Sequence, residues 1–220
     1  MKNYFASVKS NPLFRGIAYT DFEQMLDCMS AWTAKYKKDD VILLSGDSVS
    51  FVALILSGGV KIIKEDIDGN ASILAEFSVS EIFAETLACA GISQSPVTVR
   101  ASADAEILFV DYRRIIQPCT SACAFHSKLI ENMLYLLAKK NLMLNEKIEI
   151  LSKRTTREKL ICFFDHQRGA ATKFEIPFNR EELANYLCVD RSAMSNVLCA
   201  MRDDGTLKFN RNRFEIVKHW

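Results

Sequence analysis

The chain has 220 residues, of which 49% are hydrophobic and 25% charged, and its formal net charge at pH 7 is +1. This is the composition of a globular protein with one large domain or two small ones, and it excludes the disordered classes. The first residues lack the apolar run of a signal peptide and no window approaches 18 uncharged apolar residues, so we expect a cytoplasmic protein that does not span a membrane.

Residues 11–36 have a mixed pattern that we interpret as helix and loop. From Val41 to about Asp111, short apolar runs alternate with turn residues such as Gly58–Gly59 and residues 68–70, which is typical of antiparallel strands joined by hairpins. The runs cover residues 41–44, 51–56, 60–67, 72–77, 97–101 and 106–112. We therefore predict a small β-roll. A helical segment at 80–91 interrupts it and either lines a ligand cavity or merely connects two strands.

Residues 122–151 contain no glycine or proline, and their apolar residues change to helical spacing. A heptad seam of the coiled-coil kind includes Ile130, Leu134, Leu137, Asn141 and Leu144. A second apolar stripe consists of Leu129, Met133, Leu136 and Met143. We expect one face of this helix to pack on the β-roll and the other to meet the same helix of a second copy. An ordinary core helix that is buried on both sides is the alternative.

The last third of the chain has a basic surplus, because residues 152–220 carry a net charge of +4 and residues 1–151 one of −3. A helix is expected at 152–169. Asn179 and Glu182 then form a capping box that starts a short helix, a turn follows at 187–189, and Asp190 caps a second helix.

The second of these helices is expected to bury a stripe that consists of Met194, Val197, Leu198 and Met201. Its outer face is then polar, and residues 206–217 follow as a two-stranded hairpin with a basic tip, the form of a wing that lies along a phosphate backbone. Such side chains bind base edges and phosphates. The candidate DNA-contacting residues are Arg180, Arg191, Ser192, Ser195, Asn196, Arg202, Arg211 and Arg213.

This layout resembles the Crp/Fnr family of bacterial transcription regulators. The resemblance rests on NPLF at 11–14, SGGVKIIKEDIDG at 57–69, EIFAETLACAG at 81–91, VTVRA at 97–101 and, most specifically, NREELANYLCVDRSAMSNVL at 179–198. It implies an α+β protein with an antiparallel, jelly-roll-like β-roll similar to a cyclic nucleotide-binding domain (1–120), a dimerisation helix (121–151) and a winged helix-turn-helix (152–220). A homodimer bound to a near-palindromic, double-stranded operator is also implied, with RNA polymerase as a further partner of an activator.

Members of this family contact bases from the positions of Arg191, Ser192, Ser195 and Asn196. They often have Glu in place of this Ser192 and Arg in place of this Asn196, so the usual operator of the family is not assumed for this chain. Cys188 stands where Gly is common, which indicates a strained turn because a side chain disfavours the left-handed conformation.

Members that bind cyclic nucleotides have a Gly-Glu pair and then an Arg-Ser pair whose arginine binds the cyclic phosphate. The matching residues here are Ala84–Glu85 and Ser95–Pro96. Because a buried phosphate without its cation is costly, we expect a small effector other than cyclic AMP. The predicted effector pocket consists of Phe83, Glu85, Thr86, Ser95, Pro96, Asn132 and Tyr135.

The sequence gives no support for a metal or a prosthetic group. The iron-sulfur members of the family have cysteines near the N-terminus, whereas the first cysteine here is Cys28, and no Cys-x-x-Cys pair occurs. Cys119 and Cys123, the nearest pair, are interpreted as small buried thiols, with a ligand or redox role as the alternative. Of the three histidines, His126 alone lies near the sensor, and we interpret it as structural. We predict no cofactor other than the unknown effector.

An enzyme is not expected, because the catalytic motifs G-x-S-x-G, G-x-G-x-x-G and H-E-x-x-H and a Walker loop are absent from the sequence. Cys123 and His126 are at helical spacing but lack an orienting partner that can be identified in the sequence. The alternatives to an effector-controlled regulator are a constitutive DNA-binding dimer and a redox-responsive or haem-responsive regulator of the same family.

Overall fold

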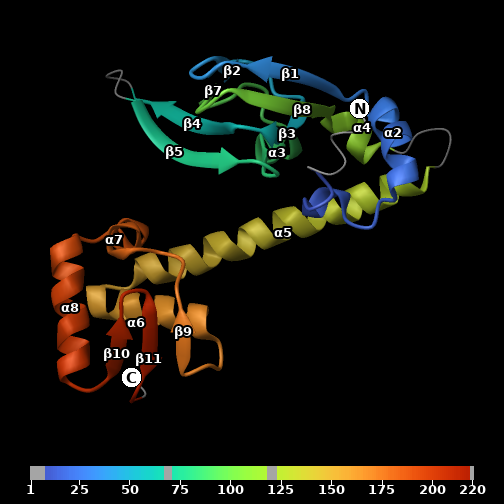
Figure 1. Cartoon of the computed structure of the whole chain (residues 1–220). Helices are drawn as coiled ribbons and strands as arrows, with labels where there is room; N and C mark the ends of the chain where they lie inside the picture. The colour runs from blue at the N-terminus through green and yellow to red at the C-terminus, as the bar shows by residue number, and fades with distance from the viewer. Residues whose placement is uncertain (1–7, 67–70, 118–122, 219–220) are drawn as a thin grey trace. The chain divides into compact units, whose positions relative to one another are not determined.

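The computed structural model describes residues 8–66, 71–117 and 123–218 (Figure 1). Two compact units make up the chain, Met1–Ala138 and Lys139–Trp220, here called the N-terminal and C-terminal units. The long helix α5 (Ala124–Ser152) begins in the first unit and ends in the second. Residues 68–70 and Cys119, which the sequence analysis named, lie outside the described residues.

The N-terminal unit contains two four-stranded antiparallel sheets. One has the order β1-β8-β3-β6 and the other β2-β7-β4-β5. The first sheet comprises β1 (Trp32–Tyr36), β8 (Ala105–Asp111), β3 (Phe51–Ser57) and β6 (Ile82–Phe83). The second comprises β2 (Val41–Leu43), β7 (Thr98–Ala101), β4 (Gly59–Glu65) and β5 (Ala71–Ser78). These strands confirm the predicted antiparallel β-roll.

Strand β3 explains why the central strands are continuous apolar runs instead of alternating ones. Its Ala53 and Ile55 belong to a core that includes Val99 of β7, between the two sheets. The intervening Val52 and Leu54 belong to a second core, which contains residues of helices α2 (Tyr19–Cys28) and α5. Because both faces of such a strand are buried, both carry apolar side chains, and the sequence shows no alternation of polar and apolar residues.

The described part of this unit also contains three short helical elements: the 3₁₀ turn η1 (Pro12–Phe14), α3 (Glu85–Cys89) and α4 (Tyr112–Ile116). Asn11 anchors the N-terminal segment, because its side-chain amide donates to the Ser80 carbonyl at 2.6 Å and its oxygen accepts from the Leu13 amide at 2.8 Å. In Figure 1, α2 and α4 lie beside the beginning of α5.

Two predictions about this unit need correction. Trp32–Tyr36 forms strand β1 instead of helix or loop, because all five residues pair with β8, from Trp32 with Phe109 to Tyr36 with Ala105. Residues 80–91 are not one helical segment, since β6 precedes α3 and Ala84 separates them with a φ of 64°. A positive φ cannot continue a right-handed helix.

After the end of α5, the C-terminal unit contains α6 (Thr156–Arg168), β9 (Lys173–Glu175), α7 (Arg180–Leu187), α8 (Arg191–Asp203), β10 (Leu207–Asn210) and β11 (Arg213–Ile216). Its core gathers Phe163 and Phe164 of α6, Leu183 of α7, Leu198 of α8 and Phe214 of β11. The predicted two-stranded wing has a third strand, because β9 pairs with β11 in a sheet of order β10-β11-β9. No helix among the described residues combines the length and apolar content needed to cross a membrane.

Candidate nucleic-acid interface and sensor site

The short helix α7 starts at the predicted capping box. The side-chain oxygen of Asn179 accepts from the amides of Glu181 and Glu182 at 2.9 Å, and the Glu182 carboxylate accepts from the Asn179 amide at 2.7 Å. These bonds satisfy amides that have no partner within the helix. They fix the point at which α7 begins and therefore the position of the turn that follows it.

The turn between α7 and α8 is built on Cys188, whose φ of 51° and ψ of 54° are left-handed. Asp190 then caps α8, since its carboxylate accepts from the Ala193 amide at 2.8 Å and from the Ser192 hydroxyl. These hydrogen bonds, with that of Ser192 the largest contribution, hold the pKa of Asp190 below its usual value. The first turn of α8 is thus held rigidly at its exposed end.

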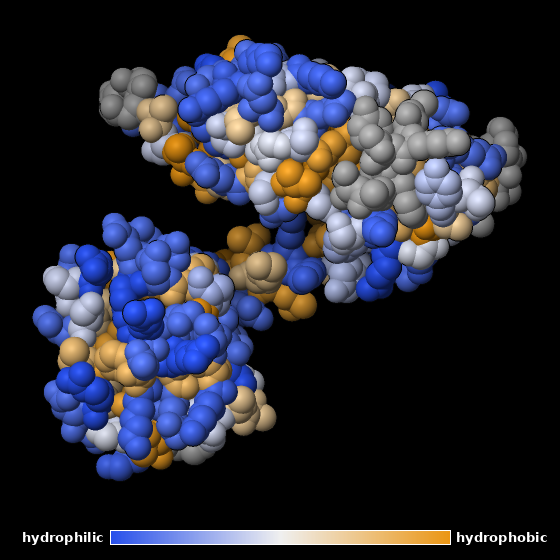
Figure 2. Space-filling model, in the orientation of Figure 1, coloured by the Kyte–Doolittle hydropathy of each residue, from blue (hydrophilic) through white to orange (hydrophobic). Residues whose placement is uncertain are grey.

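Helix α8 has one buried stripe and one exposed face. Met194, Leu198 and Met201 are buried in the core of the unit. Among the predicted DNA-contacting residues of this helix, Arg191, Ser192, Asn196 and Arg202 are exposed. Ser195 is half-buried and its hydroxyl donates to the Arg191 carbonyl at 2.8 Å. Hydrophilic residues predominate over the visible face of this unit (Figure 2).

The wing presents exposed arginines at its turn. Arg211 has a φ of 54° and lies between β10 and β11. Arg213 opens β11, and its guanidinium donates to the Glu175 carboxylate of β9 at 3.1 Å. A phosphate that binds Arg213 must therefore compete with Glu175, a constraint that the sequence did not indicate because the pair connects strands 38 residues apart.

Arg180 differs from the other predicted DNA contacts. Its guanidinium lies 4.9 Å from the ring centroid of Phe209 and 5.2 Å from that of Phe214. Burial lowers the pKa of this group. Arg180 is thus held against the aromatic residues of the wing as a cation–π contact, and its guanidinium is less available to DNA than those of Arg191 and Arg211.

Of the predicted pocket residues on the β-roll, Phe83, Glu85 and Ser95 are buried, whereas Thr86 and Pro96 are exposed. Phe83 belongs to the core between the sheets. Glu85, at the start of α3, has only 2% of its surface exposed, and the Thr86 hydroxyl donates to its carboxylate at 3.0 Å. Ser95 is also buried, and its hydroxyl donates to the Val97 carbonyl at 2.7 Å. Neither Ser95 nor the adjacent Pro96 supplies a cation for a phosphate.

The two predicted pocket residues on α5 contact the N-terminal segment. The Asn132 side-chain amide donates to the carbonyls of Leu13 at 2.9 Å and Arg15 at 2.8 Å, which uses both of its hydrogens. Tyr135 is exposed, with the Arg15 guanidinium 4.9 Å from its ring centroid. Both residues contact the N-terminal segment, and their assignment to the effector pocket stays a prediction.

Helix α5 has the two apolar faces that the sequence indicated, with one change. Leu129, Met133 and Leu136 are buried against the β-roll unit, whereas Met143, assigned to the same stripe, is exposed. On the predicted seam, Ile130 and Leu137 are half-buried and Asn141 is exposed, with its side-chain oxygen accepting from Asn145 at 3.0 Å. Leu134 and Leu144 have 63% and 61% of their surface exposed.

Models of known protein families match both units. The family model of the cyclic nucleotide-binding domain matches residues 33–121, and that of the Crp-like helix-turn-helix domain matches residues 156–219. The transcriptional activator protein FnrL of Cereibacter sphaeroides is 22% identical over 193 residues, which cover 83% of this chain and 75% of that protein.

Solved structures share the fold. The catabolite activator protein of Thermus thermophilus is 21% identical with a TM-score of 0.55, and the match covers 94% of this chain and 93% of that one. DNR from Pseudomonas aeruginosa is 18% identical with a TM-score of 0.54, and the match covers 100% of this chain and 96% of that one.

Proposed function

Because this chain belongs to the Crp/Fnr family of transcription regulators, we propose that it binds a near-palindromic operator as a homodimer, under the control of a small effector other than cyclic AMP. The observation that carries the proposal is the exposed polar face of α8, which lies opposite a stripe buried in the core. A helix supported in this way can enter the major groove and present its first turns to base edges.

Within that groove, Arg191 and Asn196 are the residues suited to direct recognition. A guanidinium bonds guanine through two hydrogen bonds, and a side-chain amide bonds adenine in the same manner. Arg211 and Arg213 of the wing contact phosphates, which fix the position of the protein without specifying sequence. The basic surplus of residues 152–220 is consistent with this division.

The homodimer is supported by the exposed apolar face of α5. Leu134, Leu144 and Ile148 recur at heptad positions and are each more than half exposed, which is unfavourable in water and favourable in a two-helix seam. Two α8 helices related by the dimer axis match half-sites about one helical turn apart. The relative FnrL is named a transcriptional activator; if this chain also activates transcription, RNA polymerase is a further partner.

The effector is proposed to bind beside Glu85 in the β-roll. A buried carboxylate favours a ligand with hydroxyl or amine donors, and the missing cation at Ser95 disfavours a phosphate. We propose no catalytic activity, since regulators of this family act by binding DNA.

Selection of bound sequences from random duplexes tests the proposal, combined with sedimentation velocity of the recovered complexes. We expect enrichment of a two-fold symmetric sequence and two chains on each duplex. Absence of any enriched sequence would contradict operator recognition, and a single chain on each duplex would contradict the homodimer.

A further inference from the structure

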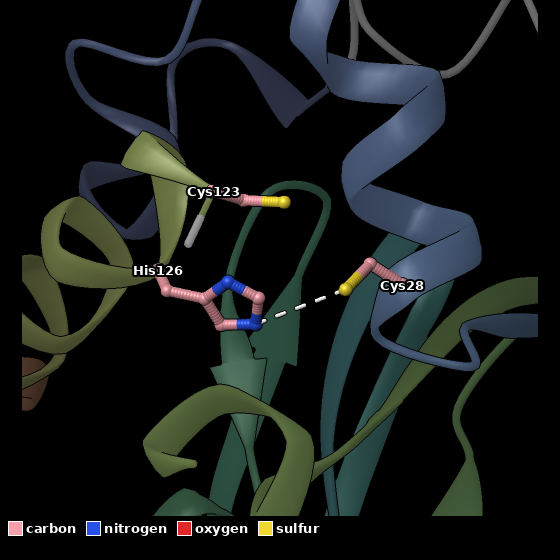
Figure 3. Close-up of side chains that lie close together, drawn as sticks. All are labelled: Cys28, Cys123 and His126. Atoms are coloured by element: carbon pink, nitrogen blue, oxygen red, sulfur yellow. Dashed lines mark hydrogen bonds between the residues drawn. The ribbon is translucent and has the colours of Figure 1, made fainter. Parts of the chain in front are cut away.

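Three side chains with metal-binding atoms, none of them assigned to the predicted effector pocket, converge in the N-terminal unit. Cys28 is the last residue of α2, Cys123 immediately precedes α5, and His126 lies in the first turn of α5. The two sulfur atoms and one ring nitrogen lie within 4.8 Å of one another, and Nε2 of His126 is 3.9 Å from Sγ of Cys28. Figure 3 shows the three side chains pointing toward a common space.

The ring of His126 gives the second, independent observation. Only 3% of this residue is exposed, and its ring stacks on Phe125 with the centroids 4.8 Å apart. Its Nδ1 atom has no hydrogen-bond partner among residues 8–66, 71–117 and 123–218. A buried nitrogen without a partner is destabilising and uncommon in native proteins. A bound cation that accepts the lone pair of Nδ1 would supply the missing partner.

We propose that Cys28, Cys123 and His126 form a binding site for Zn²⁺ or a similar thiophilic divalent cation. Zn²⁺ prefers thiolate and imidazole ligands in a tetrahedron, with bond lengths of about 2.3 Å to sulfur and 2.0–2.1 Å to nitrogen. Those bonds place ligand atoms roughly 3.5–3.8 Å apart, so small side-chain rotations close the present arrangement. Binding converts both thiols to thiolates and releases two protons to solvent. The fourth position remains for water or another ligand.

A second group of possible ligands, Glu149, Cys162 and His166, is less suited to this role. The Glu149 carboxylate already accepts from Lys153 at 3.3 Å and lies 3.2 Å from Nε2 of His166. The Lys153 ammonium would repel a cation there. Metal bound at this second group must be distinguished from metal at the proposed site, so a substitution of His166 serves as a control.

The proposed site connects the end of α2 to the beginning of α5. Both helices contribute to one apolar core, through Phe22 and Met25 of α2 and Leu129 and Met133 of α5. The bound cation therefore constrains the first turn of the helix that carries the exposed seam. The site lies entirely within the N-terminal unit, so its existence does not depend on the proposed DNA-binding function.

The test is a titration of the full-length chain, freed of metal and kept reduced without air, with Co²⁺ followed by Zn²⁺. We expect one equivalent of Co²⁺ to give thiolate charge-transfer bands and the visible bands of tetrahedral cobalt, and Zn²⁺ to remove both. Cys28→Ser and Cys123→Ser should each reduce the charge-transfer intensity by about half. Each of these two variants, and also the single variant His126→Gln, should bind Zn²⁺ at least tenfold more weakly in competition with a chelator. Cys89→Ser and His166→Gln are matched controls that should retain the wild-type spectrum.

A measurement on the unmodified protein covers the case in which a variant fails to fold. Cys28 and Cys123 are partly accessible, whereas Cys188 is exposed, so Zn²⁺ should slow iodoacetamide labelling of the first two and leave that of Cys188 unchanged. The proposal is overturned if the reduced protein gives no tetrahedral cobalt spectrum or if the bands disappear only in His166→Gln. The proposal is also overturned if the reduced protein binds no metal and forms a Cys28–Cys123 disulfide in air. That result would identify a redox pair instead.

Discussion

At the scale of single residues, the first turn of α8 determines what can contact DNA. Asp190 is committed to the Ala193 amide and the Ser192 hydroxyl, so Ser192 is already oriented by its neighbour. Arg191 and Asn196 are exposed on the same helix, and Arg213 is paired with Glu175. Exposed ion pairs contribute little stability in water, so a phosphate can replace Glu175 as the partner of Arg213.

Arg191→Ala should weaken operator binding by about 1–3 kcal/mol and change binding to random DNA very little, because a guanidinium with two bonds to guanine discriminates between bases. The measurement is a salt titration with a selected operator and a random duplex. Equal losses on both duplexes would show that Arg191 contacts phosphate, and no loss on either would remove α8 from the groove.

Arg213→Ala should weaken binding to both duplexes and lower the slope of log affinity against log salt by about one unit, because one phosphate contact is lost. Glu175→Gln is the matched variant. It removes the competing carboxylate and should strengthen binding to both duplexes. An unchanged salt slope in Arg213→Ala would exclude this phosphate contact.

Cys188→Gly should raise the free energy of unfolding by up to ~1 kcal/mol, since glycine removes the penalty that a β-carbon incurs in the left-handed conformation. Cys188 is exposed, so little packing is lost. Urea denaturation measures the change, with Cys188→Ser as the control that keeps the β-carbon and gives no gain. A less stable glycine variant would mean that the turn is not strained.

At the scale of elements, α5 shows how one helix serves two environments. Its Leu129, Met133 and Leu136 pack on the core of the N-terminal unit, whereas the seam residues Leu134 and Leu144 remain exposed. The first set stabilises a single chain and the second can be buried only by a partner. A substitution on the seam can therefore separate assembly from folding.

Leu144→Lys should convert the proposed dimer to monomers, because two ammonium groups would face each other in an apolar interface. Leu142→Lys is the matched control, since Leu142 is 63% exposed and lies off the heptad seam, against 61% for Leu144. Sedimentation velocity measures the oligomeric state, and thermal melting checks the fold. A dimeric Leu144→Lys variant would contradict the seam.

At the scale of the whole molecule, the proposed effector depends on whether the β-roll carries a cation that can bind a phosphate. Glu85 is buried, and Ser95, which we match with the phosphate-binding arginine of cyclic-nucleotide-binding members, is buried with its hydroxyl donating to the Val97 carbonyl. The acidic surplus of residues 1–151 also disfavours an anionic ligand.

Millimolar cyclic AMP should therefore shift neither the melting temperature nor the operator affinity of the intact protein. Calorimetry and a DNA-binding titration with and without the nucleotide measure both quantities. AMP serves as the control for nonspecific effects of a phosphate. A saturable shift with cyclic AMP and not with AMP would show that the β-roll binds the cyclic phosphate without the arginine.

The amino-acid sequence by itself determined the features that depend on neighbouring residues. The strands from Val41 to Asp111, the helix α5 and the capped helices α7 and α8 all follow from periodicity and capping within a few residues. The polar face of α8 could be predicted for the same reason, because a helical period assigns each side chain to a face. Its solvent exposure followed once Met194 and Leu198 were assigned to the core.

Only the tertiary structure decided which distant residues meet. Strand β1 exists because it pairs with β8, and β9 because it pairs with β11; neither short segment has a strong pattern of its own. Asn132 contacts the carbonyls of Leu13 and Arg15, and Cys28 lies beside Cys123 and His126, although about a hundred residues separate each set in the chain. Such contacts form where packing brings surfaces together, and periodicity carries no information about a partner so far away.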